Sequence, residues 1–300
     1  MSIALPVATR RRTLAAWLEL TKPRIVLLVL FTGLPAILLA AAGTPPARVF
    51  WGAGIGIALS AASAAAFNHY YDRDLDALML RTRMRPLPAG VLAPAHAAML
   101  GLVLAWTSYV VLAVFCNPLS ALLAMANIFY YAVVYTIWLK RRTPQNIVIG
   151  GGAGASAPII AWAAVTGRVE WPAIAIAAII FLWTPPHFWA LSLYRREDYV
   201  RAGLPMLPVT HGEPETRRQI LLYSLALVPL TLAVGPIAGL GPLYLGAAAV
   251  LGALFLAGAF QLWRAPSVPR AMRLFRFSIL YLFCLFLVMS VDAYLKLRSA

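Results

Sequence analysis

The sequence predicts an all-α integral membrane protein with nine transmembrane helices around a central cavity. Hydrophobic residues make up 62% of the chain and charged residues only 12%, with a mean hydropathy of +0.81. A soluble domain carries about a quarter charged residues. Apolar runs of about 20 residues, long enough to cross a bilayer as helices, recur along the whole chain. We therefore treat residues 1–300 as a single membrane domain, with residues 1–24 as a cytoplasmic N-terminal segment.

The apolar runs define the nine expected spans. Clusters of glycine and proline separate several of them and mark the turns. The two cysteines lie in apolar runs far apart in the sequence, so we expect neither a disulfide nor a metal site from them. The spans are expected at residues 25–43, 49–70, 94–115, 118–138, 147–166, 171–193, 219–238, 242–263 and 274–295.

The basic residues predict the orientation of these spans. With nine spans, 21 of the 25 lysines and arginines fall on the same side of the membrane as the N-terminus. The four on the other side are Arg48, Arg168, Lys296 and Arg298. Basic loops remain in the cytoplasm, so we expect the N-terminus and the loops over the active site to face the cytoplasm of a bacterial inner (plasma) membrane. A net charge of +15 would suggest nucleic acid in a soluble protein, but orientation charge explains it here, and we expect no nucleic-acid partner.

A weak internal repeat relates residues 21–90 to residues 143–212. The matching residues lie at helix starts and in acidic loops, and each half contains an even number of spans. This favours an ancient duplication with both halves running in the same direction. The pairs share one offset of 122 positions: Thr21 with Thr143, Asp76 with Asp198, Pro86 with Pro208 and Gly90 with Gly212.

An acidic stretch at the end of the second span is the main candidate site. Carboxylates close to a bilayer are costly and indicate function. On a helix with about 100° per residue, Asn68, Asp72 and Asp76 share one face, whereas Asp74 points away and is expected to pair with a neighbouring basic residue. We refer to Asn68, Asp72 and Asp76 as the acid stripe.

The acid stripe has the donor chemistry of a Mg2+ site. Carboxylate and amide oxygens suit this hard cation, which commonly shares its coordination between one or two carboxylates and substrate phosphates. A basic rim on the same side would bind the remaining negative charge of a diphosphate. The rim comprises Arg81, Arg83, Arg85, Lys140, Arg141 and Arg142.

A second acidic loop follows the sixth span and contains Glu197 and Asp198. The repeat offset places Tyr194 opposite Asp72, so only Asp76 has an acidic counterpart in this half. Residues 199–209 are unusually hydrophobic for a cytoplasmic loop, and we expect them to cap the cavity.

These motifs resemble the UbiA superfamily of intramembrane prenyltransferases over residues 14–296. The first motif is Asn68-x3-Asp72-x3-Asp76 followed by Arg81-Thr82-x-x-Arg85-Pro86-Leu87. The branch that farnesylates haem is similar in its Thr184-Pro-Pro-His-Phe-Trp-Ala190 run and its Ala202-Gly-x-Pro-Met206 run. Thr21-Lys22-Pro23-Arg24, before the first span, also fits.

The resemblance implies transfer of a farnesyl group from farnesyl diphosphate to the 2-vinyl group of haem b, with water added, to give haem O. It assigns Mg2+–diphosphate binding, and with it catalysis, to Asn68, Asp72, Asp76 and Asp198. Tyr194 stands where the second motif usually has an acid. Whether a second metal ion binds is therefore open, and Glu197 is a candidate substitute ligand. The residues expected to bind substrate are Lys22, His69, Arg81, Arg85, Lys140, Arg141, His187 and Tyr194.

A farnesyl cation needs a dry site, and aromatic rings stabilise cations. The aromatic residues at the expected depth are Tyr70, Tyr71, Tyr130, Tyr131, Phe188 and Trp189. His187 follows a Pro-Pro pair expected to break the sixth span and open it to the cavity. Neutral imidazole is a common haem ligand, and the choice between His69 and His187 stays open.

Two other functions are compatible with parts of this pattern. A prenyltransferase acting on an aromatic acid for quinone synthesis would share the acid stripe, and a transporter would share the intramembrane acids and the repeat. Besides the two substrates and the lipid bilayer, the partners expected are a downstream haem-modifying enzyme or oxidase assembly factors.

Overall fold

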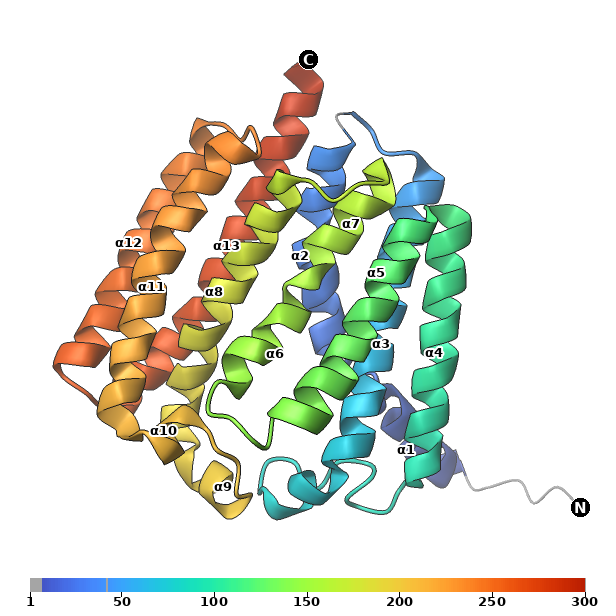
Figure 1. The fold of residues 1–300 in the computed structure, drawn as a ribbon, viewed down its shortest axis with the longest axis vertical. Coiled ribbons are helices and arrows are strands. Elements are labelled where there is room, and N and C mark those ends of the chain that lie inside the picture. Colours follow the sequence, from blue (N-terminus) through green and yellow to red (C-terminus); the bar gives the residue numbers. More distant parts are fainter. Residues whose placement is uncertain (1–6, 42, 300) are drawn as a thin grey trace, which may run out of the picture.

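A computed structural model describes residues 7–41 and 43–299, with side chains described for 13–41 and 43–296. Residues 10–12 and Arg298, which contributed to the orientation argument, therefore lie outside the described side chains. The secondary structure of the described chain is helical (Figure 1). The helices are α1 (Val7–Leu20), α2 (Pro23–Ala40), α3 (Ala47–Leu78), α4 (Pro94–Phe115), α5 (Pro118–Phe129), η1 (Tyr130–Leu139), α6 (Asn146–Gly154), α7 (Ser156–Thr166), α8 (Trp171–Tyr194), α9 (Arg196–Arg201), α10 (Leu207–Thr210), α11 (Gly212–Ile237), α12 (Pro242–Arg264) and α13 (Val268–Ser299).

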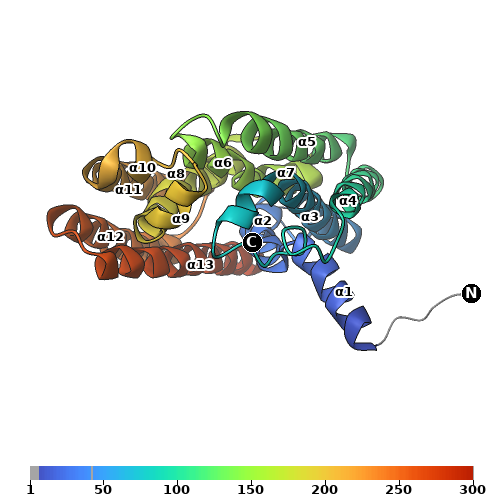
Figure 2. The ribbon, with the colours of Figure 1, turned by 90° about the horizontal axis from the view of Figure 1, so that it is seen from below.

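Nine helical segments of the described chain are long and apolar enough to cross a membrane, as the sequence predicts. In Figure 1, α1 lies at the lower end of the bundle and α13 ends at the upper end. Figure 2 shows α1 projecting outwards from the edge of the bundle. The first span begins earlier than expected because residues 13–40 form one segment that bends at Lys22. The second was expected to end at residue 70 but continues to Leu78, so the whole acid stripe lies on a helix, as its spacing requires.

The α3–α4 pair shows how small residues allow spanning helices to approach. A Cβ atom at Gly56 would lie 2.4 Å from Leu112 Cγ, and one at Gly52 would lie 2.5 Å from Phe115 Cβ. Ser108 Oγ also donates to the Gly56 carbonyl at 2.7 Å. Close backbone approach and interhelical hydrogen bonds stabilise helix packing in lipid, and they fix α3, which carries the acid stripe.

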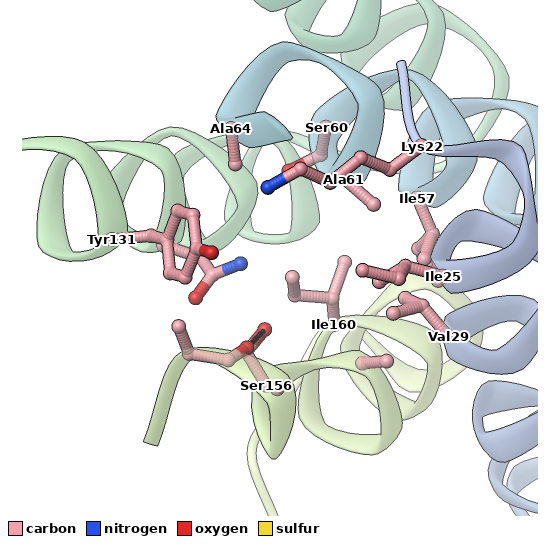
Figure 3. Close-up of a pocket in the computed structure, with 14 residues that line it drawn as sticks. Lys22, Ile25, Val29, Ile57, Ser60, Ala61, Ala64, Tyr131, Ser156 and Ile160 are labelled. Carbon is pink, nitrogen blue, oxygen red and sulfur yellow. Dashed lines mark hydrogen bonds between the residues drawn. The ribbon is translucent and has the colours of Figure 1, made fainter. Parts of the chain in front are cut away.

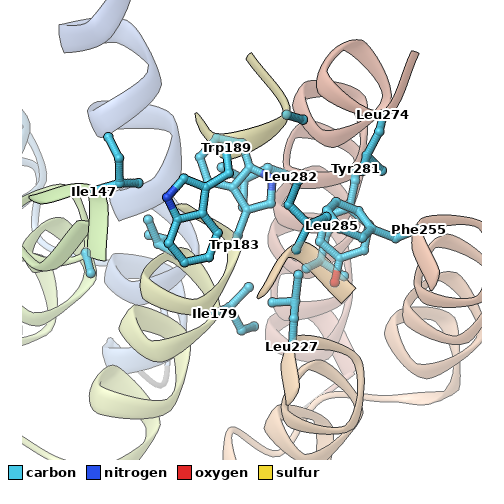
Figure 4. Packing of buried hydrophobic residues seen from close by; sticks show 14 of the residues in the cluster. Ile147, Ile179, Trp183, Trp189, Leu227, Phe255, Leu274, Tyr281, Leu282 and Leu285 are labelled. Atoms are coloured by element: carbon cyan, nitrogen blue, oxygen red, sulfur yellow. The ribbon is translucent and has the colours of Figure 1, made fainter. Parts of the chain in front are cut away.

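The larger apolar core joins α8, α11, α12 and α13 (Figure 4). Trp183, Leu227 and Tyr281 contribute to it from three different helices. Trp189 is fully buried there against Tyr223. Trp189 therefore packs in the core, contrary to the expectation that it contributes an aromatic face to a cation site.

The sixth span is not broken at its two prolines, which corrects the expectation from sequence. Helix α8 runs continuously from Trp171 to Tyr194 with Pro185 and Pro186 inside it. Thr184 Oγ1 donates to the Ile180 carbonyl at 2.7 Å. Because Pro185 and Pro186 have no N–H, the carbonyls that lose their helical donors are those of Phe181 and Leu182, and not that of Ile180.

The hydrophobic loop after α8 folds into α9 and α10. Ala202, Leu204, Met206 and Leu207 are buried, in the same cluster as Leu75 and Met79 around the end of α3. The apolar character of residues 199–209 is thus explained by packing at the end of the bundle that carries the acid stripe.

Candidate active site

The acid stripe is buried on one face of α3. Asn68, Asp72 and Asp76 are 4%, 2% and 2% exposed. Asp74 faces outwards and receives two 2.8 Å hydrogen bonds from Arg141. Asp74 is therefore separate from the stripe, as the helical spacing predicts.

Three basic side chains contact the stripe, one at each residue. Lys22 Nζ donates to Asn68 Oδ1 at 2.6 Å. Lys140 Nζ donates to Asp72 Oδ2. Arg85 Nη1 contacts both oxygens of Asp76, at 2.9 and 2.7 Å.

Further hydrogen bonds fix the shape of the stripe. Asn68 Nδ2 donates to Asp72 Oδ2 at 2.6 Å, so the amide links two members of the stripe. Thr82 Oγ1 donates to the Asp76 carbonyl at 2.9 Å, which ties the following turn to the end of α3. The turn thereby holds Arg85 near its carboxylate.

The π-helix η1 packs beside the stripe. Thr136 Oγ1 donates to the carbonyl of Tyr131, five residues earlier, at 2.7 Å, and receives a weaker bond from Asn68 Nδ2 at 3.4 Å. A Cβ atom at Gly150 would lie 2.8 Å from the Tyr135 ring, so α6 accepts this ring only because glycine is there. Such π-helical segments are frequent at functional sites.

Lys22 lies at a strained bend between α1 and α2. It has a φ of +49° and is the one non-glycine residue of the described backbone with a positive φ. Such a conformation is unusual for a side chain other than asparagine or aspartate. Strain of this kind clusters at functional sites, and here it places the lysine against Asn68.

Two cavities meet at Lys22. The mouth cavity, of about 660 Å³, is rich in cations. The inner cavity, of about 100 Å³, is mainly apolar, and in Figure 3 the amine end of Lys22 points toward Tyr131 across it. The mouth cavity is lined by Ala15, Leu18, Glu19, Lys22, Pro23, Arg24, Ile25, His69, Arg81 and Arg85. The inner cavity is lined by Lys22, Ile25, Val29, Ile57, Ser60, Ala61, Ala64, Asn127, Tyr131, Ala153, Gly154, Ser156, Ala157 and Ile160.

An anionic group at the stripe would thus have an apolar cavity beside it. Residues 29–287 of the chain match the UbiA prenyltransferase family. The chain belongs to this family.

Curated UbiA-family relatives share about half of their residues with this chain. Protoheme IX farnesyltransferase from Symbiobacterium thermophilum is 51% identical over 278 residues, which cover 92% of this chain and 93% of the relative. The protein of the same name from Parvibaculum lavamentivorans is 52% identical over 283 residues, covering 93% and 89%.

Solved UbiA-family structures share the fold at much lower identity. A digeranylgeranylglyceryl phosphate synthase superposes with a TM-score of 0.79 at 18% identity, covering 94% of this chain and 99% of that one. A UbiA homologue from Archaeoglobus fulgidus bound to DMAPP and Mg2+ gives 0.61 at 21% identity, covering 92% and 99%.

The residues of the stripe fit a hard divalent cation. Asp72 Oδ1 is buried and has no hydrogen-bond partner, and buried polar atoms of this kind call for an explanation such as an ion. Among the described side chains, however, no three His, Cys, Asp or Glu residues cluster in a way that could hold a metal. A metal at the stripe would therefore rely on Asn68, on water and on phosphate oxygens besides Asp72 and Asp76.

The second acidic loop contributes one buried acid. Asp198 is 7% exposed and accepts a 2.6 Å hydrogen bond from Arg201. Burial raises the pKa of the neighbouring Tyr199. Tyr194 is 45% exposed and lies under the guanidinium of Arg195, and Glu197 is exposed.

The remaining expected rim residues are not all at the stripe. Arg81 borders the mouth cavity. Arg141 lies outside the stripe, where its hydrogen bonds with Asp74 hold its pKa above the usual range. No ion pair is found for Arg83 or Arg142 among the described side chains.

The two candidate histidines have different surroundings. His69 is 1% exposed and lines the mouth cavity. His187 is stacked between Trp183 and Phe275, with Nδ1 2.6 Å from Ser278 Oγ. Because the Ser278 hydroxyl donates to the Phe275 carbonyl, Nδ1 of His187 must donate to Ser278, which leaves the lone pair on Nε2.

Thr82 and Thr136 belong to the site but were not expected as site residues. Thr82 lies within the first motif, so its position in that motif was an available signal. Nothing in the sequence around Thr136 distinguishes a π-helix from an α-helix. Its contact with Asn68 is visible only in the structure.

Proposed function

We propose that this chain transfers the farnesyl group of farnesyl diphosphate to the 2-vinyl group of haem b, with addition of water, giving haem O and diphosphate. The observation that carries the proposal is the junction at Lys22. There Lys22, which contacts Asn68 of the buried stripe, lines both a cationic mouth cavity and an apolar inner cavity. The names of the relatives at about 50% identity supply the two substrates.

The diphosphate is assigned to the stripe and its basic partners. Lys22, Arg81, Arg85 and Lys140 bind phosphate oxygens. Asn68, Asp72 and Asp76 are the proposed ligands of Mg2+ at the stripe, and Asp198 is the proposed ligand on the second acidic loop. Bound Mg2+ would neutralise charge on the departing diphosphate. The cations of the chain provide the same kind of stabilisation from fixed positions.

The inner cavity is assigned to the farnesyl chain. Its lining is mostly apolar, and Tyr131 and Lys22 both border it. When the C1–O bond of farnesyl diphosphate breaks, both electrons leave with the diphosphate. The vinyl π electrons then form the new carbon–carbon bond to C1, and a water oxygen adds to the resulting cation and loses a proton. An aromatic face beside C1 stabilises the positive charge in this sequence.

Haem b is assigned to the side of the site that opens at the mouth cavity. Arg24, which lines this cavity, offers a cation to a haem propionate, and His69 and His187 are the two candidate contacts to the macrocycle or iron. His69 is at the mouth cavity, whereas His187 presents Nε2 as an acceptor.

The cellular setting is part of the proposal. The charge distribution favours an N-terminus and a site on the cytoplasmic side of the membrane, which we take to be a bacterial inner membrane. Haem O produced there would pass to a haem-modifying enzyme or to oxidase assembly factors.

The direct test is product formation by the purified protein. We expect farnesyl diphosphate, Mg2+ and haem b to yield haem O, detected by chromatography and mass spectrometry. Farnesylated 4-hydroxybenzoate as the sole product would instead identify the chain as an aromatic-acid prenyltransferase.

A further inference from the structure

We propose that Lys140 and its neighbouring cations exclude divalent metal from the acid stripe until a diphosphate draws them away, so that metal and diphosphate bind cooperatively. The inference rests on the proposed function in taking diphosphate as the anion. It adds that the basic residues control metal binding as well as substrate binding.

The first support is that the cations contact the oxygens that a metal would need. Lys140 donates to Asp72 Oδ2, Arg85 covers both oxygens of Asp76, and Lys22 contacts Asn68 Oδ1. A metal that takes these oxygens must displace an ammonium or guanidinium group from each. Of the side-chain oxygens of the stripe, Asp72 Oδ1 alone has no hydrogen-bond partner.

The second support is burial. The side chains of Asp72 and Asp76 are only 2% and 3% exposed, and those of Lys140 and Arg85 only 18% and 20%. Water therefore screens these groups weakly. A lysine or arginine that remained beside the stripe after a metal had bound would face the divalent ion at short range, which is strongly unfavourable.

The third support is the balance of charge. The stripe has two carboxylates but contacts three basic side chains, Lys22, Arg85 and Lys140. Lys22 is close enough to the other two to act on them electrostatically. A metal ion alone increases this positive excess. A metal ion that arrives with a prenyl diphosphate, which carries up to about three negative charges, lowers it.

The fourth support is that two of the three cations have somewhere else to bind. Lys22 and Arg85 contact the stripe and also line the mouth cavity. A diphosphate in that cavity can accept hydrogen bonds from them, which frees the oxygens of Asn68 and Asp76. Phosphate is a good acceptor for such charge-assisted bonds.

The test measures metal binding without prenyl transfer, using Mn2+ as the probe and inorganic diphosphate as the anion. Calorimetry on the purified full chain gives the Mn2+ affinity with and without diphosphate, at known free Mn2+. Because coupling between sites is reciprocal and is typically about 5- to 150-fold, we expect diphosphate to tighten Mn2+ binding by about tenfold or more. The affinity for diphosphate must rise by the same factor with Mn2+.

Lys140→Met is the decisive variant, and Arg141→Met is its matched control. The two residues are adjacent, but Arg141 is paired with Asp74 outside the stripe. We expect Lys140→Met alone to bind Mn2+ about tenfold more tightly in the absence of diphosphate and to lose most of the coupling. Lys140→Arg, which keeps the charge, should retain the coupling and guards against an effect of misfolding.

Two results would overturn the inference: equal Mn2+ affinity of the unaltered protein with and without diphosphate, or equal Mn2+ affinities of the Lys140→Met and Arg141→Met variants. These results are independent of the acceptor substrate. Cooperative Mn2+ binding by a protein that forms no haem O would refute the proposed function and leave this inference standing.

Discussion

Asp72 and Asp74 form a natural pair for testing the site, because they lie two residues apart on opposite faces of α3. Asp72→Asn removes the charge from a buried group that contacts Lys140 and Asn68. Asp74→Asn removes the same charge from an exposed group paired with Arg141.

The structure predicts very different losses for the two variants. Loss of one pre-organised group that stabilises developing charge in a transition state costs about 3–4 kcal/mol, and about 1.4 kcal/mol corresponds to a tenfold change in rate. Asp72→Asn should therefore lower kcat/KM by about 10²- to 10³-fold. The Asp74–Arg141 pair has side-chain exposures of 62% and 39%, and exposed pairs contribute below about 1 kcal/mol, so Asp74→Asn should change kcat/KM by less than about fivefold.

The assay is the initial rate of haem O formation at saturating Mg2+, with thermal unfolding measured for each variant. Both proteins must be folded at the assay temperature. Equal losses for the two variants, or full activity of Asp72→Asn, would refute the assignment of the stripe.

Three further predictions address packing, orientation and the metal. Gly56→Ala places a Cβ atom against Leu112 and should destabilise the protein by about 1–3 kcal/mol, measured as a lower unfolding temperature. In Gly54→Ala the added Cβ atom has nothing within 4 Å, so the unfolding temperature should not fall. Equal shifts in the two variants would contradict the close α3–α4 contact. Orientation can be tested with single cysteines in a background without native cysteines. Arg168→Cys should react with an impermeant thiol reagent in intact spheroplasts, and Arg83→Cys should react only after lysis. The opposite pattern would reverse the proposed orientation. Removing divalent ions with a chelator should abolish product formation and added Mg2+ should restore it, so activity that persists in the chelator would exclude a metal-dependent reaction.

The sequence predicted the spans well because their signal is local. Twenty apolar residues in a row are sufficient evidence for a spanning helix, and all nine were found within the described chain. The end of the second span was harder to predict. The charged residues Asp72, Asp74 and Asp76 suggest a loop by composition, but tertiary partners allow the helix to continue to Leu78.

Helix periodicity also separated Asp74 from the stripe correctly. It could not identify the partner of each carboxylate, because Lys22 and Lys140 are 46 and 68 residues from the groups they contact. Pairing over such distances depends on how α2, α3 and η1 pack.

The two local features that sequence reasoning missed have physical explanations. Pro185 and Pro186 indicate a break, yet both are buried and α8 continues through them where its neighbours Trp183 and Trp189 pack in the core. The π-helix at Tyr130–Leu139 matches the glycines of α6, which leave room for the rings of Tyr130 and Tyr135. The internal repeat of residues 21–90 and 143–212 stays a prediction.

The most direct test of the central claim is a competition between acceptors. Purified protein would receive farnesyl diphosphate and Mg2+ with haem b and 4-hydroxybenzoate together, and both products would be quantified over time. We predict that haem O accumulates and that Asp72→Asn suppresses it. Exclusive farnesylation of 4-hydroxybenzoate, or no prenylated product from a folded protein, would contradict the account.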